Sequence, residues 1–169
     1  MIDQSTNLKE ELLSLAESAS CYYIKSSSIV AKISFKGRDF YTKYRLIQNP
    51  LDESTKERYL KGEIKIAIPL KRGEIFIRYF GDEKERFLYL LSKSWREFDK
   101  KWSIYFLDER ENINIITAFE SENIGEIIET ISKRLSTILD KEWKILPDEN
   151  LPDSYNIFTL PDASLFDRD

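Results

Sequence analysis

The stretch Glu74-Ile-Phe-Ile-Arg-Tyr-Phe80 decides the fold of this chain. Its side chains alternate between two faces with the period of two that a β-strand has, and both faces are mostly apolar or aromatic. A strand of that kind is expected in the interior of a sheet, where both of its faces are covered. The sequence therefore predicts a central strand over residues 74–80.

The residues after this strand predict a helix and a second hairpin. Asp82 stands three residues before Glu85, which is the spacing of an N-cap and its capping-box partner. Apolar side chains then recur every three or four residues, so we expect a helix over residues 83–99 with one face buried against a sheet. Strands at 102–107 and 112–119 come next, joined by a polar turn.

Two more helices and further strands are predicted on either side of this region. Asn7 and Asn123 each stand three residues before a Glu and precede an apolar stripe, which predicts helices over residues 7–19 and 123–142. Residues 52–60 are polar enough to be a loop or one short helix. Period-two alternation predicts further strands at residues 29–35, 40–46 and 64–70, and residues 22–25 and 155–160 could add two short ones.

These elements predict an α+β fold with antiparallel pairing. We expect a sheet of about 5–7 strands packed by three helices as a two-layer sandwich. A hairpin is expected to turn at residues 36–39, and Pro69 should end its strand or place it at a sheet edge. Residues 1–146 are predicted to form a single domain, followed by an acidic, proline-containing C-terminal arm at 147–169.

Composition places the chain among soluble globular proteins. It has 169 residues, of which 41% are hydrophobic and 33% charged, enough apolar content for one buried core. No stretch of about 20 apolar residues is present, and the N-terminus lacks the basic-then-apolar layout of a signal peptide. The single Cys21 agrees with a reducing compartment. We therefore expect a cytoplasmic protein that does not contact a membrane.

Charge is distributed unevenly along the chain. Residues 21–101 contain 19 basic and 11 acidic side chains, whereas residues 102–169 contain 6 basic and 15 acidic ones. This pattern is typical of a nucleic-acid surface, of an acidic tail that covers a basic face, or of solvated charges on a Lys/Glu-rich protein. The charge count leaves these three interpretations open.

Residue types argue against most kinds of catalysis. The chain has no histidine, the most frequent general acid–base and transition-metal ligand, and its five glycines form no phosphate-binding loop. Asp108, Glu109 and Glu111 share one polar turn that could in principle hold a hard cation, but they lack the spacing and the glycine of a calcium loop. We therefore predict a non-enzymatic protein without a cofactor or a metal, and a solvated turn at 108–112.

The segment Arg72–Tyr79 resembles the longer signature of the RNA-recognition motif at its basic, glycine, central aromatic, aliphatic and final aromatic positions. It departs from that family at Glu74 and Ile75, where the family has an aromatic and a small residue. The resemblance implies binding of single-stranded nucleic acid as an alternative function. Candidate binding residues on and near this strand are Arg72, Phe76, Arg78, Tyr79, Phe80, Trp95 and Trp102.

The order of the predicted elements over residues 7–142 is similar to that of type III secretion chaperones and their sensory-regulator relatives. That resemblance implies a small, acidic, cytoplasmic protein that dimerises and binds partner polypeptides. Abundant aromatic side chains also suit a protein interface. The favoured prediction is a protein-binding module, acting as a chaperone, adaptor, inhibitor or immunity-type partner, with a homodimer left open and nucleic acid as the alternative partner.

Overall fold

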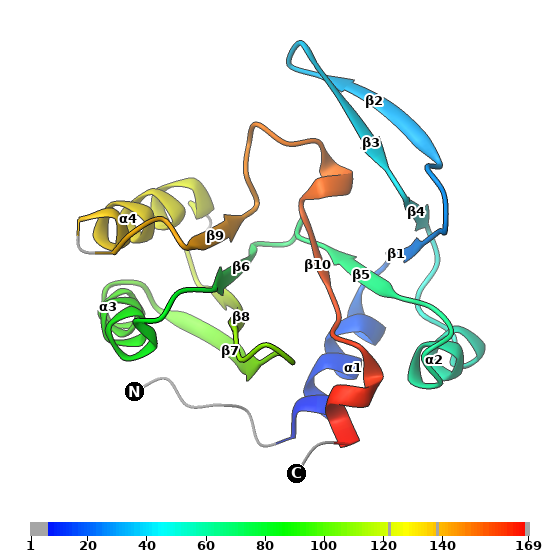
Figure 1. The fold of residues 1–169 in the computed structure, drawn as a ribbon, viewed down its shortest axis with the longest axis horizontal. Helices are drawn as coiled ribbons and strands as arrows, with labels where there is room; N and C mark the ends of the chain where they lie inside the picture. Colours follow the sequence, from blue (N-terminus) through cyan, green and yellow to red (C-terminus); the bar gives the residue numbers. More distant parts are fainter. Residues whose placement is uncertain (1–6, 122, 138, 168–169) are drawn as a thin grey trace. The chain divides into compact units, whose positions relative to one another are not determined.

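The computed structural model describes residues 7–121, 123–137 and 139–167 (Figure 1). The described chain contains four α-helices, ten β-strands and two short 3₁₀ helices, and it divides into two compact units. We call residues 71–146 the β6 unit, after its central strand. Residues 7–70 together with 147–167 are called the hairpin unit.

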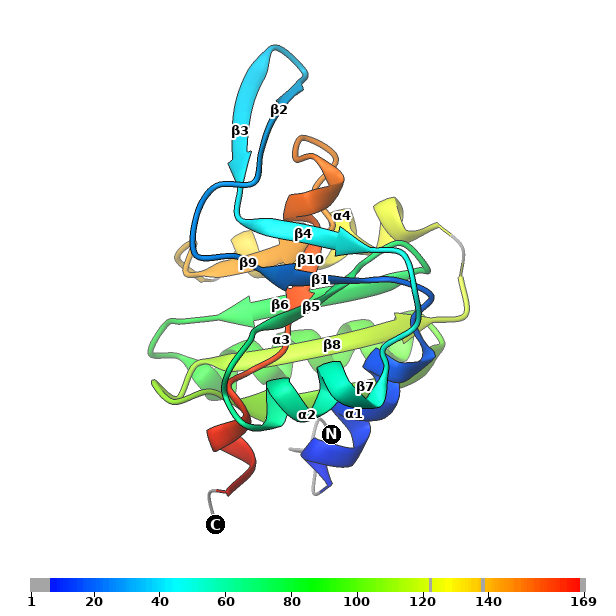
Figure 2. The same ribbon diagram turned by 90° about the vertical axis from the view of Figure 1, so that its right-hand side faces the viewer.

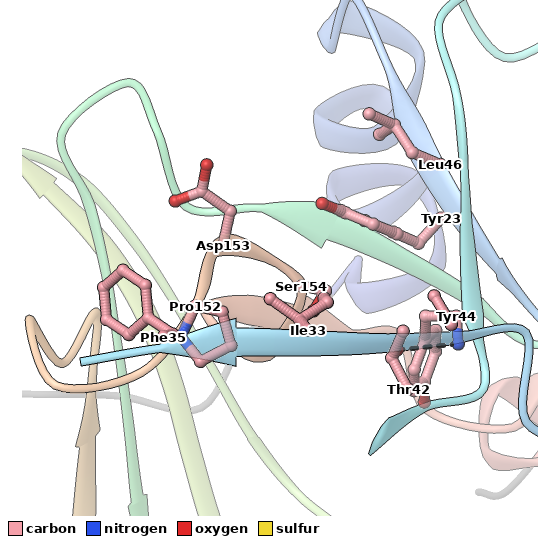
Figure 3. A pocket seen from close by; sticks show the side chains of 10 residues that line it. Tyr23, Ile33, Phe35, Thr42, Tyr44, Leu46, Pro152, Asp153 and Ser154 are labelled. Carbon is pink, nitrogen blue, oxygen red and sulfur yellow. Dashed lines mark hydrogen bonds between the residues drawn. The ribbon is translucent and has the colours of Figure 1, made fainter. Parts of the chain in front are cut away.

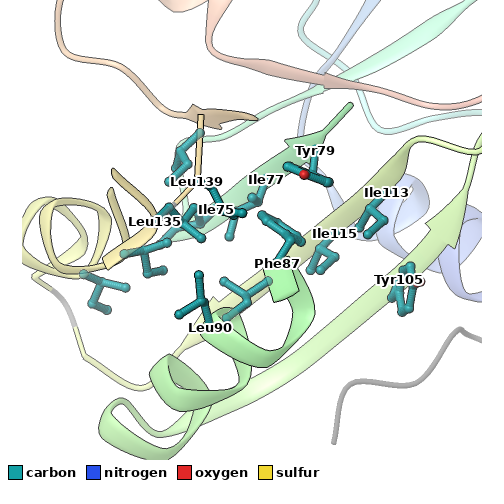
Figure 4. Close-up of a cluster of buried hydrophobic side chains, with 14 of the residues drawn as sticks. Ile75, Ile77, Tyr79, Phe87, Leu90, Tyr105, Ile113, Ile115, Leu135 and Leu139 are labelled. Carbon is teal, nitrogen blue, oxygen red and sulfur yellow. The ribbon is translucent and has the colours of Figure 1, made fainter. Parts of the chain in front are cut away.

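The β6 unit is a four-stranded antiparallel sheet with two helices. Its elements are β6 (Glu74–Tyr79), α3 (Lys84–Glu97), β7 (Lys100–Leu107), β8 (Ile113–Phe119), α4 (Ile124–Ser136) and β9 (Trp143–Leu146), and the strand order is β7-β8-β6-β9. Both helices cover the same face of the sheet, where Ile77, Phe87 and Ile131 belong to one buried apolar cluster (Figure 4). An Arg134 guanidinium on α4 donates a 2.7 Å hydrogen bond to the Ser94 hydroxyl on α3.

The hairpin unit is a second antiparallel sheet with a projecting two-stranded ribbon. Its elements are α1 (Leu8–Ser18), β1 (Tyr22–Lys25), β2 (Ala31–Phe35), β3 (Arg38–Thr42), β4 (Tyr44–Ile47), α2 (Glu53–Leu60), β5 (Ile66–Pro69), η1 (Asp153–Tyr155), β10 (Ile157–Thr159) and η2 (Ala163–Asp167). The sheet order is β10-β5-β1-β4, and β2 pairs with β3 in a separate ribbon that extends away from this sheet (Figure 2). A 2.9 Å ion pair between Lys56 and Glu17 joins α2 to α1.

The α+β class with antiparallel pairing is confirmed, and so is the interior position of the strand at 74–79. The prediction of one sheet with three helices is wrong in detail. Among the described residues there are two four-stranded sheets, a separate ribbon and a fourth helix, α2, in the polar segment 52–60. β9 was not predicted because its four residues come after a helix without any clear alternation.

The predicted strand at 40–46 divides between the ribbon and the sheet. Its first part, β3, pairs with β2, while its second part, β4, pairs with β1. Between β1 and β2, residues 26–29 turn away from the neighbouring strand. This excursion is bounded by two backbone hydrogen bonds, from the Ser26 N–H to the Lys43 carbonyl and from the Val30 N–H to the Thr42 carbonyl. One long predicted hairpin therefore becomes two paired segments.

Helix caps were predicted with mixed success. The Asn123 side chain accepts a hydrogen bond from the Glu126 N–H, as the capping-box spacing predicts. Asn7 makes no side-chain cap bond, and the predicted cap at Asp82 is wrong because α3 begins one residue later. There the Tyr79 hydroxyl accepts the Glu83 N–H at 2.9 Å.

The C-terminal segment, which was predicted to be an arm, contains a short strand and two 3₁₀ helices. The short strand predicted within 155–160 is present as β10, which pairs with β5. β5 ends at Pro69, as predicted, although β10 and β1 flank it on both sides. The chain does pass from one unit to the other after residue 146, but residues 7–70 and 71–146 belong to different units, and residues 147–167 group with residues 7–70. No helix in the described part of the chain is long and apolar enough to cross a membrane.

Candidate binding site

The candidate residues on and near β6 lie on two opposite faces of its sheet. Tyr79 is only 2% exposed and stacks on Phe87 with 4.6 Å between ring centroids, on the helix-covered face (Figure 4). Trp95 packs edge-on against Phe119 in the same cluster. These two aromatic rings stabilise the core of the β6 unit.

Three other candidates share the face that points away from α3 and α4. Strand alternation puts Phe76 and Arg78 there, and the pairing of β6 with β8 and of β8 with β7 adds Trp102. The Arg78 guanidinium contacts the Asp108 carboxylate at 3.1 Å. Phe80, half exposed, lies just beyond the end of β6. The structure therefore does not bring the seven candidates together on one surface.

Glu74 has a structural role at the position where the chain departs from the RNA-recognition signature. Its carboxylate is buried and accepts the Arg72 N–H at 2.8 Å, and the Arg72 side chain lies 3.8 Å away. Gly73 between them has φ +88°, a left-handed conformation that favours glycine. The acid closes the turn into β6, which accounts for the residue type at this position.

Asp108 organises the polar turn between β7 and β8. Its carboxylate accepts hydrogen bonds from the Arg110 and Asn112 N–H groups and from the Asn114 amide. Partial burial of Asp108 raises its pKa, but these hydrogen bonds and the Arg78 charge outweigh burial and hold the pKa below its ordinary value. Among the described residues, no group of acidic or cysteine side chains is arranged to hold a metal ion.

A cavity of about 430 Å³ lies in the hairpin unit (Figure 3). Its walls come from β1, from both strands of the ribbon, from β4, and from Pro152 and the start of η1. The lining is mostly aromatic and aliphatic, and it consists of Tyr23, Ala31, Ile33, Phe35, Thr42, Tyr44, Leu46, Pro152, Asp153 and Ser154. This composition, with few polar groups in an apolar surface, is typical of a ligand-binding concavity.

Two contacts hold the ribbon over the C-terminal segment. The Phe40 ring meets Tyr155 edge-on at 5.2 Å, and the Tyr155 hydroxyl donates a 2.6 Å hydrogen bond to the Tyr41 carbonyl. The Asn156 amide in turn donates to the carbonyls of Asp148 and Leu151 and so fixes the loop before η1. The cavity walls are therefore connected although they lie more than a hundred residues apart in the sequence.

Ser154 supplies an unsatisfied polar group in the cavity wall. The residue is 8% exposed, and its hydroxyl has no hydrogen-bond partner among the described residues. By contrast, the Thr42 hydroxyl accepts the Tyr44 N–H at 3.0 Å, and the Tyr44 hydroxyl lies 3.1 Å from that of Thr159. A buried hydroxyl without a partner costs free energy, and this one has almost no surface exposed to the cavity.

Sequence reasoning missed this site. The strands were predicted, but their side chains were not among the candidate binding residues, and the loop that contributes Pro152 to Ser154 carries no local signal. Near the cavity the structure leaves three apolar side chains, Ile29, Val30 and Tyr41, largely exposed within thirteen residues, although none of them lines it. Exposed apolar side chains that gather in one place are typical of interaction surfaces.

Comparison with known proteins adds one match. Residues 8–73 match the family described as a domain of unknown function (DUF1882). The matched residues include β1 to β4, which provide most of the cavity wall, and only Arg72 of the seven candidates around β6. No curated protein matches the chain.

Proposed function

We propose that the protein is a non-enzymatic protein-binding module, of the chaperone, adaptor, inhibitor or immunity type, and that the cavity of the hairpin unit receives an apolar side chain of its partner. The observation that carries this proposal is the apolar cavity beside a strand that has a free edge. Among the described residues, β2 pairs only with β3, so its other edge has unpaired backbone groups.

A free edge next to a pocket is suited to binding an extended peptide. A peptide strand paired with β2 would form backbone hydrogen bonds and direct alternate side chains to the face that carries Ile33 and Phe35. Those two side chains line the cavity.

Site-specific crosslinking tests this proposal in the native cell. A photo-crosslinking phenylalanine analogue in place of Phe35 should form an adduct with a defined partner protein, and mass spectrometry should locate the adduct on one short segment of it. The matched control carries the analogue in place of Tyr89, an exposed tyrosine on α3 of the β6 unit.

Three results bear directly on the proposal. An adduct that forms at position 35, is absent at position 89 and is lost on adding Ile33→Glu supports it. Equal adducts at both positions contradict it. A small molecule that stays bound through native mass spectrometry and is lost in the Ile33→Glu variant also contradicts it, since the cavity would then bind a small molecule.

A further inference from the structure

The ribbon has a second face, opposite the cavity. Thr42, Tyr44 and Leu46 all line the cavity, so strand alternation continues from β3 into β4. The residues between and beside them, Tyr41, Lys43 and Arg45, therefore lie on the opposite face. Lys32 joins them because it is the cross-strand partner of Tyr41.

This outer face carries more basic than acidic side chains. Its basic residues are Lys32, Lys43 and Arg45, all exposed, and its one acid is Asp39, which pairs with Ser34 on the same face. Lys32 lies 3.6 Å from Asp39, but both side chains are more than half exposed, which makes their attraction weak. Within the described chain, Lys43 and Arg45 make no ion pair. The face therefore presents cations that are free to meet an anionic partner.

An exposed aromatic ring stands among these cations. Tyr41 is 52% exposed, with Lys32 opposite on β2 and Lys43 two residues further along the chain, between β3 and β4. Neighbouring side chains on one face of a strand are spaced about 6.6 Å apart, which is similar to the spacing of phosphates in an extended nucleic-acid strand. An acidic peptide would neutralise the cations but would leave the ring without a planar partner.

We propose that Lys32, Tyr41, Lys43 and Arg45 form a binding site for single-stranded nucleic acid, in which the Tyr41 ring stacks on a base and the three cations contact phosphates. Stacking on an exposed ring requires an unpaired base, which is why the proposal names a single strand. The site is distinct from strand 72–80 and from the cavity, and it stands or falls independently of the protein-binding function.

Fluorescence anisotropy with labelled twelve-nucleotide oligo(dT) and oligo(rU) tests this site on the full-length protein. Three phosphate contacts predict a slope of log affinity against log salt of about −2, so affinity should fall roughly twentyfold between 50 and 200 mM NaCl. Lys43→Gln should weaken binding and make that slope less steep by about 0.7.

The ring contribution is tested with a matched pair of tyrosines. Tyr41→Ala should weaken oligonucleotide binding at least about fivefold because base stacking is lost. Tyr89→Ala is the control, since Tyr89 is also exposed and has the Lys93 ammonium 4.8 Å from its ring centroid. It should leave the affinity unchanged, and both variants should keep the circular dichroism of the wild type.

Specific outcomes would overturn the proposal. One is that neither oligonucleotide binds at 50 mM NaCl when the protein concentration is raised to roughly 100 µM. Another is that Tyr41→Ala and Tyr89→Ala lower the oligonucleotide affinity equally. Equally tight binding of a labelled poly-glutamate peptide, insensitive to Tyr41→Ala, would show a general site for acidic polymers instead.

Discussion

Strand β6 and the β2–β3 ribbon both carry aromatic and basic side chains, but in opposite environments. Tyr79 on β6 is buried under α3, while Tyr41 on the ribbon is exposed. The difference arises from the next element along the chain. After β6 comes a helix with a wide apolar stripe, whereas after β2 come a two-residue turn and another amphipathic strand. A basic, aromatic strand is thus an interaction surface only when nothing in the fold covers it.

The largest expected effect on stability comes from removing the Tyr79 ring, with removal of the Tyr41 ring as the comparison. Tyr79→Ala should lower the free energy of unfolding by about 3–5 kcal/mol, because a buried, stacked ring is lost. Tyr41→Ala should change it by no more than about 0.5 kcal/mol, because its ring is half exposed. Urea denaturation followed by circular dichroism measures both values.

The Tyr79 hydroxyl can be separated from its ring. Tyr79→Phe keeps the stacking on Phe87 and leaves the Glu83 N–H without its acceptor, so it should cost about 1 kcal/mol. If Tyr79→Ala and Tyr41→Ala destabilise the protein equally, the contrast between the two regions is not one of burial.

The next effect tests the helix that covers β6. Ile131 and Leu135 on α4 are buried, and replacing either by Ala should cost about 2–4 kcal/mol. Lys133→Ala is the control on the same helix, since its ion pair with Glu129 is largely exposed and contributes little. Wild-type melting of both apolar variants would show that the stripe is a docking surface and not core.

The sequence predicts the elements that local patterns encode. Period-two alternation and apolar stripes located most of the strands and all three longer helices, because those patterns depend only on neighbouring residues. The partition into two sheets was not predictable in this way, since it depends on the excursion at 26–29 and on pairing between β5 and β10. The cavity was hidden for the same reason, because Ser154 and Tyr23 are joined only by tertiary structure.

A moderate, pH-dependent effect is expected at Asp108. Because hydrogen bonds and Arg78 hold its pKa below the ordinary value of 3.8, its ionised form stabilises the fold above that value. As the pH falls, this contribution should begin to be lost near pH 4. The loss should be complete once the pH is below the lower pKa that Asp108 has in the folded state. Asp108→Asn should cost about 1–2 kcal/mol at pH 7 and should flatten the acid limb of stability against pH.

Glu109→Gln is the matched control for the acid limb. Glu109 is the next residue in the same turn and is exposed. Its removal should leave the stability at pH 7 and the acid limb unchanged. If both variants have the same pH profile as the wild type, Asp108 does not link the turn to Arg78 as the geometry indicates.

The smallest effect concerns the ribbon turn, where Lys36 and Gly37 have φ of +48° and +77°. Two positive φ values in succession are typical of a type I′ turn, for which Asn-Gly is the preferred pair. Lys36→Asn should therefore stabilise the ribbon by about 0.5 kcal/mol, since Asn adopts the left-handed region more readily than Lys. Gly37→Ala should destabilise it by about 1 kcal/mol, purely through the backbone, because no atom lies within 4 Å of an added Cβ. Amide hydrogen exchange in β2 and β3 measures both changes.

Lys36 lies in the turn and outside the proposed nucleic-acid site, so Lys36→Asn should slow exchange while lowering oligonucleotide affinity less than Lys43→Gln does. A larger loss with Lys36→Asn would move the cationic contact from the outer face to the turn.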